Sequence, residues 1–253
     1  MPLDTAETVL SAVEDGVHSI TLNRVAKKNA LTLDMYNAMT AALKNGEASD
    51  DVGCHLFLGQ PGVFCAGNDI ADFMKFAMSG GLGTPILEFL RTVASLEKPV
   101  MAGVDGLAIG VGTTLLFHCD YVVASDRSTF KTPFTDLGLV PEAASSLIGP
   151  RLMGPQDAYA LLALGRTFSP DDAKRARFIA EIISPDAVAG VARGAAKEAA
   201  SKPKEAMAIS KRLLRGSPDE VIARIEEEAE HFAARLTSDE AREAFQAFLA
   251  KGR

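Results

Sequence analysis

The pattern of apolar and polar residues predicts strands in the first half of the chain. Residues 8–13 and 17–22 are expected as two strands, and the intervening Glu14-Asp15-Gly16 is typical of a hairpin turn. Further strands are expected at residues 52–58, 100–104 and 121–124. After about residue 145 such patterns nearly vanish, so the sheet should be built from the earlier part of the chain.

Helical spacing of apolar residues first appears at residues 31–43, where Thr32 is the expected N-cap and Asp34 lies in the first turn. Further helices are expected at residues 70–78, 86–96 and 113–117. Two later helices should begin at Ser169 and Ser217, because each serine is followed by Pro and Asp. Strands with helices, followed by helices alone, predict an α/β core with a helical C-terminal region.

The helix after Ser217 carries one apolar stripe on an otherwise charged surface. The stripe consists of Val221, Ile222, Ile225, Ala229, Phe232, Ala233 and Leu236. Two interpretations stay open: a solvated outer helix, or a helix that contacts another subunit.

Composition narrows the class of protein. The 253 residues hold 26 Lys plus Arg and 33 Asp plus Glu, a net charge of −7, and 47% of them are hydrophobic. This composition indicates a folded globular protein and argues against nucleic-acid binding. Cys54, Cys65 and Cys119 show no CxxC spacing, which suggests reduced thiols and a cytoplasmic location. Neither a signal peptide, a membrane span nor a C-terminal peroxisomal signal is expected.

Common catalytic templates do not match the chain. It has no GxSxG, HExxH or GxxxxGK[ST] sequence, and Gly110-Val-Gly112 lacks the third glycine of a dinucleotide fingerprint. The four histidines, at positions 18, 55, 118 and 231, have no ligand spacing. We therefore expect no metal.

Two glycine-containing turns and one acidic residue are the better candidates. The turns, residues 62–70 and 106–114, each lead into a helix, where backbone N–H groups are left unpaired. Two such turns converging on one point would form an oxyanion hole, although each alone is compatible with an ordinary turn. Glu142 stands among apolar and small residues, which would raise its pKa toward a range useful for proton transfer. Alternatively, Glu142 caps a helix that begins near Ser145.

These segments resemble the crotonase superfamily, the enoyl-CoA hydratase/isomerase family. The resemblance covers nearly the whole chain and is carried by residues 22–31, 64–69, 106–112, 119–120 and 238–245. It implies a spiral of ββα units, residues 1–200, that holds the active site. It also implies a helical region, residues 201–253, that builds trimers, often paired into hexamers.

The resemblance implies an acyl-CoA thioester as substrate, with no separate cofactor. Backbone N–H groups of Ala66 and Val111 would bind the thioester oxygen. Val111 replaces a common glycine and should narrow the pocket. The two glutamates of typical hydratases match Thr114 and Phe134 here, whereas Glu142 matches the single base of peroxisomal-type Δ3,Δ2-enoyl-CoA isomerases.

The resemblance also suggests how the CoA part would be bound. Ala26 and Lys28 match the segment along the pantetheine and nucleotide, and Asn68, Asp69 and Ile70 match the loop at the adenine end. Gly110, Thr114 and Phe134 complete the expected substrate contacts. Lys211 and Arg212 are candidates for phosphate contacts or are ordinary surface charges, and Gly80-Gly81-Leu82-Gly83 falls at the family's mobile loop near the acyl tail.

An enoyl-CoA isomerase is therefore the leading hypothesis. The alternatives are a hydratase or another reaction of this family, with Asp136 assisting Glu142, and a protein that only binds acyl-CoA.

Overall fold

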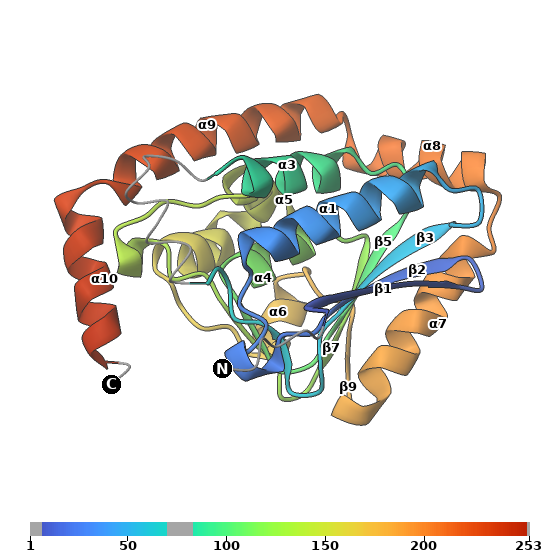
Figure 1. The fold of residues 1–253 in the computed structure, drawn as a ribbon, viewed down its shortest axis with the longest axis horizontal. Helices are drawn as coiled ribbons and strands as arrows, with labels where there is room; N and C mark the ends of the chain where they lie inside the picture. Colours follow the sequence, from blue (N-terminus) through green and yellow to red (C-terminus); the bar gives the residue numbers. More distant parts are fainter. Residues whose placement is uncertain (1–6, 70–82, 252–253) are drawn as a thin grey trace.

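A computed structural model describes residues 7–69 and 83–251 of the chain. The expected helix at residues 70–78, Ile70 and most of the glycine-rich loop at residues 80–83 lie outside the described residues. Figure 1 shows a twisted sheet with helices on both faces and a helical C-terminal part along one side. The α/β fold with a helical C-terminal region is confirmed.

The strands form two sheets. The larger sheet has the order β1-β2-β3-β5-β7-β9, in which only the β1–β2 hairpin is antiparallel, and the smaller sheet has the order β4-β6-β8 and is parallel. The strands are β1 (Val9–Glu14), β2 (Val17–Leu22), β3 (Cys54–Leu58), β4 (Val63–Cys65), β5 (Val100–Val104), β6 (Leu107–Ile109), β7 (Tyr121–Ser125), β8 (Thr129–Lys131) and β9 (Glu181–Ile183). Each of β3, β5 and β7 is followed by a short strand in the smaller sheet, which gives the repeating spiral.

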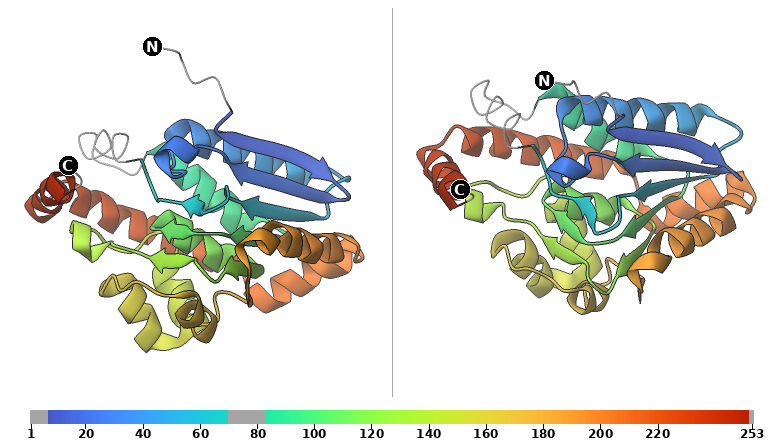
Figure 2. Two further views of the ribbon diagram at one scale, coloured as in Figure 1. Left: turned by 90° about the horizontal axis from the view of Figure 1, so that it is seen from below. Right: turned by 60° about the horizontal axis from the view of Figure 1, so that its bottom comes forward.

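The helices are arranged around these sheets (Figures 1 and 2). Those of the core are α1 (Leu33–Ala48), α3 (Thr84–Ser95), α4 (Val111–Thr114), α5 (Ser145–Ala158), α6 (Pro170–Arg175) and α7 (Val188–Ala200). Those at the C-terminal end are α8 (Lys204–Arg215), α9 (Pro218–Leu236) and α10 (Asp239–Lys251). Short 3₁₀ turns cover residues 25–27, 115–118, 135–137 and 185–187, and a π-helical turn covers residues 159–163. None of the described helices is long and apolar enough to cross a membrane.

Strand β3 explains how the larger sheet is covered on both faces. All five of its residues are buried, and successive side chains point to opposite faces. Leu56 and Leu58 belong to a cluster with Ala192 and Ala196 of α7, whereas Phe57 belongs to the main core with α1 and α3. The main core continues to the smaller sheet and to the apolar stripe of α9, which packs against α3.

The helix starts largely match the sequence prediction. The Thr32 side chain caps α1, Ser169 forms a capping box with Asp172, and Ser217 caps α9. Strand β9 was not expected. It has three half-buried residues and pairs with β7 at the edge of the sheet, a pattern too short to detect in the sequence.

Candidate active site

The two glycine turns lie side by side. Strands β4 and β6 are parallel neighbours, so the turns that follow them leave the same edge of the smaller sheet. An ideal Cβ atom on Gly110 would lie 3.9 Å from the Cα atom of Gly67. A Cβ atom on Gly112 would lie only 2.8 Å from both Cβ and the carbonyl oxygen of Cys65, which explains why glycine is required there.

The second turn presents unpaired backbone N–H groups. Gly110 N donates to Lys131 O at 2.8 Å, and the N–H groups of Thr113 and Thr114 donate to Gly110 O. The N–H groups of Val111 and Gly112 open α4 and have no acceptor in the described part of the chain. Val111 is 2% exposed, so these donors lie in a region of low water content.

The first turn differs from expectation at Ala66. Its N–H donates to the carbonyl oxygen of Lys28 at 3.0 Å, so it is already engaged, and this corrects the expected role as an oxyanion donor. Leu31 bonds to both neighbours of Asn68, accepting from Asp69 N and donating to Gly67 O, each at 2.8 Å. The Asn68 N–H has no acceptor among the described residues and points away from Leu31, because successive groups of an extended segment alternate.

Glu142 is a buried carboxyl group with one side-chain partner among the residues that the structure describes. Its side chain accepts a hydrogen bond from Thr114 Oγ1 at 2.6 Å, and the residue is 4% exposed. Burial raises the pKa of Glu142 to about 7, the Thr114 hydroxyl opposes this rise, and the negative charge of Glu228 adds to it. The carboxyl does not cap the following helix, because only its backbone carbonyl bonds to Ser145 N.

The backbone directly after Glu142 is strained. Ala143 and Ala144 have φ values of +61° and +54°, although neither is glycine. Each such conformation costs roughly 1–2 kcal/mol for an L-residue with a side chain. Both residues are at most 1% exposed, so surrounding contacts must maintain the turn that presents Glu142.

The two positions of the expected hydratase glutamates hold non-acidic side chains, and one of them, Thr114, contacts Glu142. Thr114 is fully buried and bonds to Glu142, and Phe134 is 6% exposed within the main core. Asp136, the alternative second acid, lies on the 3₁₀ turn at residues 135–137, where its side chain is 48% exposed and pairs with Lys131 at 2.9 Å. Glu142 therefore has no second acidic partner from these positions.

Lys28 lies beside the first glycine turn, and Ala26 lies two residues before it on the preceding 3₁₀ turn. Both are exposed on or next to the 3₁₀ turn at residues 25–27, and the Lys28 carbonyl bonds to Ala66 N. Asp69 forms an ion pair with Arg24 at 2.7 Å. Arg24 was not expected in this region. Its side chain also bonds to Ala30 O, which ties the 3₁₀ segment to the loop of the first turn.

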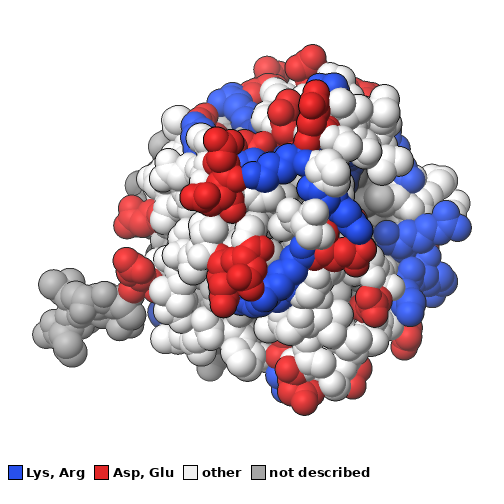
Figure 3. All heavy atoms as spheres, turned by 90° about the vertical axis from the view of Figure 1, so that its right-hand side faces the viewer, with Lys and Arg blue, Asp and Glu red and all other residues white. Residues whose placement is uncertain are grey.

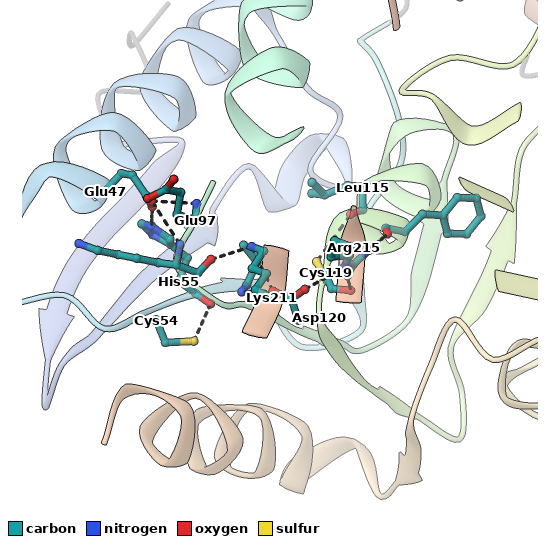
Figure 4. A network of polar contacts seen from close by, with 12 residues as sticks. Glu47, Cys54, His55, Glu97, Leu115, Cys119, Asp120, Lys211 and Arg215 are labelled. Carbon is teal, nitrogen blue, oxygen red and sulfur yellow. Dashed lines mark hydrogen bonds and ion pairs between the residues drawn. The ribbon is translucent and has the colours of Figure 1, made fainter. Parts of the chain in front are cut away.

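Lys211 is not available for phosphate contacts. Figure 4 shows Lys211 and Arg215 of α8 converging on Asp120, at 3.1 and 2.9 Å, and Lys211 also donates to Lys98 O. Arg212 remains exposed on the same helix. On the face shown in Figure 3, basic and acidic side chains are interspersed and form no continuous basic surface.

Three further residues form hydrogen bonds to the site, although the sequence pattern did not predict them as site residues. Tyr36 of α1, which is 1% exposed, donates its hydroxyl to Asn68 Oδ1 at 2.6 Å. His118 Nε2 lies 2.7 Å from Ala143 O, and Glu228 of α9 accepts from Ser146 N at 2.9 Å. Glu228 falls on the apolar face of its helix, three residues after Ile225 and four before Phe232, so helical spacing could have identified it.

A buried carboxyl group of raised pKa beside two turns with free N–H groups defines a site for proton transfer to and from a carbonyl compound. The sequence matches the Enoyl-CoA hydratase/isomerase family over residues 12–253, and the chain belongs to this family.

Relatives with several activities are similar to the chain. Enoyl-CoA delta isomerase 2 of Rattus norvegicus is 36% identical over 251 residues, which cover 96% of this chain and 63% of the rat protein. The chain thus spans less than two thirds of that relative's length. 1,2-Epoxyphenylacetyl-CoA isomerase of Escherichia coli (strain K12) is 31% identical, covering 97% of this chain and 96% of the relative. A relative from Rhizobium meliloti named "Probable enoyl-CoA hydratase" is 30% identical over 97% of this chain and 96% of its own.

Solved structures share the fold closely. Pseudomonas aeruginosa OdaA superposes with a TM-score of 0.91 at 38% identity, covering 96% of this chain and 99% of that one. The structure of an enoyl-CoA hydratase/isomerase from Pseudoalteromonas atlantica T6c superposes with a TM-score of 0.91 at 35% identity, covering 97% of this chain and 98% of that one.

Proposed function

We propose that the protein is a Δ3,Δ2-enoyl-CoA isomerase, which moves a carbon–carbon double bond of an acyl-CoA thioester. One observation carries this proposal: the buried carboxyl group of Glu142 bonds to Thr114 at the end of the second glycine turn, and Thr114 and Phe134 stand where a hydratase needs its acids. A double-bond shift needs one group that both takes and returns a proton, whereas hydration must also position a water molecule.

In the proposed reaction, ionised Glu142 removes a proton from C2 of a 3-enoyl-CoA. The C2–H electron pair moves into a C1–C2 double bond, and the negative charge collects on the thioester oxygen. The N–H groups of Val111 and Asn68 hold that oxygen, with Asn68 taking the place first expected for Ala66. Glu142 then returns the proton to C4, where the C3–C4 π electrons form the new C–H bond. The C1–C2 π electrons become the C2–C3 double bond, the oxygen restores the carbonyl, and 2-enoyl-CoA is formed. Atoms and electrons balance without an oxidant, a reductant or a separate cofactor.

The surroundings of Glu142 suit both steps. A pKa of about 7 leaves the group partly ionised at neutral pH, so it can act as base and then as acid. Phe134 and the buried backbone around it keep water away from the dienolate. We propose that the exposed segment with Ala26 and Lys28, the loop with Asn68, Asp69 and Ile70, and the Gly110 turn bind the CoA part.

We also propose that the enzyme acts in the cytoplasm, in fatty-acid or related acyl-CoA degradation, as a trimer or a hexamer of paired trimers. Residues 201–253 would supply contacts between subunits. Sedimentation equilibrium of the full chain tests the assembly: a monomer would contradict it.

One assay tests the reaction. The purified protein is given 3-enoyl-CoA, 2-enoyl-CoA and 1,2-epoxyphenylacetyl-CoA in parallel, with Glu142→Gln as the inactive variant and Glu230→Gln, an exposed residue of α9, as the matched control. Formation of 2-enoyl-CoA from the first substrate, lost only in Glu142→Gln, supports the isomerase. Comparable water addition to 2-enoyl-CoA supports a hydratase instead, and binding without turnover supports a protein that only binds acyl-CoA.

A further inference from the structure

The turn that carries Glu142 is held from two sides by elements that are distant in sequence. One side is the 3₁₀ turn at residues 115–118, which follows α4, and the other is α9 of the helical C-terminal part. Each contributes one buried polar side chain to the backbone between Ala143 and Ser146. The proposed reaction uses neither side chain directly.

His118 fixes the carbonyl group next to Glu142. Burial lowers the pKa of His118 to about 4, so the ring is neutral at neutral pH. A carbonyl oxygen only accepts, and His118 Nε2 must therefore carry the proton that it donates to Ala143 O. Thr114 and His118 stand on one continuous helical segment, so the same segment holds the Glu142 carboxyl and the carbonyl that follows it.

Glu228 fixes the other end of the turn. One of its oxygens accepts from Ser146 N at 2.9 Å, and the backbone N–H of Ala144 also lies close enough to lower its pKa. The residue is 5% exposed, and Oε2 has no hydrogen-bond partner in the described part of the chain. Burial raises the pKa of Glu228, and these hydrogen bonds oppose the rise. Arg224, one turn earlier on α9, bonds to Ser146 Oγ at 3.1 Å and also opposes it.

We infer that His118 and Glu228 are positioning residues of Glu142: from two sides they hold the strained Ala143–Ala144 turn that presents its carboxyl group. The catalytic role of Glu142 rests on the proposed function, whereas the contacts of His118 and Glu228 with the turn are independent of it.

The position of Glu228 also has an electrostatic effect, because its negative charge raises the pKa of Glu142 in addition to the effect of burial. The other titratable groups that face Glu142 supply no such charge. Tyr36 comes from α1 and Cys65 from β4, and burial raises the pKa of the Tyr36 phenol and raises that of the Cys65 thiol to about 12. Both are neutral near pH 7, and so is His118. Among the described residues, Glu228 is the charged side chain whose field acts on Glu142, with Arg224 and Glu227 forming an ion pair beyond it on α9.

Glu228→Gln tests the charge while keeping the shape, because the amide oxygen still accepts from Ser146 N. The pKa of Glu142 should fall by about one unit, because the repulsion from one partly screened negative charge is lost. It is measured by ¹³C NMR of glutamate-labelled protein, with the Glu142 signal assigned by its loss in Glu142→Gln. In the isomerase assay, the pKa that defines the acid limb of the kcat–pH profile should fall by the same amount. The value of kcat at pH 6, relative to its plateau at high pH, should therefore rise about fivefold. Glu230→Gln should change neither quantity.

Substitutions of His118 provide a second, independent test. Gln can donate an N–H from a position close to that of Nε2, whereas Phe leaves Ala143 O unpaired. We expect His118→Phe to lower kcat about tenfold at unchanged KM, and His118→Gln to restore most of it. His231→Gln, an exposed histidine of α9, is the control.

Each outcome decides the inference. An unchanged Glu142 pKa in folded Glu228→Gln overturns the role of Glu228, and equal kcat in His118→Phe and wild type overturns that of His118. If Glu228→Gln does not fold, the His118 pair still decides whether the turn must be held. Absence of isomerase activity in the wild type contradicts the proposed function alone, because the NMR titration needs no substrate.

Discussion

Glu142 and Glu47 are two carboxyl groups of the same fold with opposite surroundings. Glu142 has one hydroxyl partner, a strained backbone and a pKa raised to about 7 by burial. Glu47, at the end of α1, bonds to His55 Nε2 at 3.0 Å and accepts from the N–H groups of Glu97 and Lys98, which hold its pKa below the usual range despite partial burial. The number of donors decides whether a carboxyl group exchanges protons near neutral pH or serves as a fixed anion.

The Glu47 site continues as a chain of aligned hydrogen bonds (Figure 4 shows its Glu47–His55 end). His55 Nδ1 lies 3.0 Å from His18 Nδ1, and His18 Nε2 lies 2.8 Å from Ser11 Oγ. Gly46 makes room for both rings, because a Cβ atom there would lie 2.5 Å from His18 Nδ1. No residue between 44 and 51 has a positive φ, in contrast to the turn after Glu142.

The largest expected effect is that of Glu142→Gln. Loss of the general base should lower kcat on 3-enoyl-CoA about 10³-fold while the free energy of unfolding falls by less than about 1 kcal/mol. Steady-state kinetics and urea unfolding measure the two quantities. A variant that retains more than a tenth of wild-type kcat would show that Glu142 is not the base.

Glu47→Gln should give the reverse result. We expect kcat to be unchanged and the free energy of unfolding to fall by about 2 kcal/mol at pH 7, because a charged acceptor of three donors is lost. The pKa of Glu47 is lower in the folded protein than in the unfolded chain, where it is about 4.3, so ionised Glu47 stabilises the fold above that pH. This stabilisation is lost as the pH falls through the pKa of the folded protein. The difference between wild type and variant should therefore close below about pH 4. A difference that is constant with pH would contradict this account.

Thr114→Val removes the hydroxyl that donates to Glu142 and tests whether the number of donors sets the pKa of a carboxyl group, as the comparison of Glu142 with Glu47 indicates. The pKa of Glu142 should rise by about one unit, since a hydrogen bond to a charged group is worth about 1.5 kcal/mol or more. A base must be ionised, so kcat should fall about tenfold at pH 6 and by less than about twofold at pH 9. This shift is opposite in sign to that expected for Glu228→Gln, and shifts in the same direction would refute the electrostatic explanation. Thr114→Ser, which keeps the hydroxyl, is the control.

Ser11→Ala should have the smallest effect. It removes the exposed end of the hydrogen-bond chain that begins at Glu47, and we expect a loss of about 0.5–1 kcal/mol in unfolding free energy with kcat unchanged. Thermal unfolding at pH 7 measures it. A loss as large as that of Glu47→Gln would mean that the chain acts as one cooperative unit.

Much of the fold follows from local patterns. Thr32, Ser169 and Ser217 cap the expected helices, and the hairpin turn falls at Asp15 and Gly16, both of which have positive φ. Helix α1 runs five residues past its predicted end, because burial of Gly46 beside two histidines depends on tertiary packing.

The site was only partly predictable. Glu142 and Val111 could be singled out because a lone acid and a glycine turn are local features. The engagement of the Ala66 N–H by Lys28 depends on two segments that are distant along the chain, as does the bond from Tyr36 to Asn68. Glu228 lies in an acidic run, Glu226–Glu230, which favours a surface interpretation unless its place on the apolar face is noticed.

The burial of Glu142 has an isotopic consequence. We expect a proton held on a carboxyl group that is 4% exposed to exchange with solvent more slowly than it returns to the substrate. Substrate deuterated at C2 should therefore yield product that retains deuterium at C4, even in ordinary water. Mass spectrometry of the product measures the fraction of deuterium that is retained. Phe134→Ala should lower this fraction, because a smaller side chain admits more water to the site.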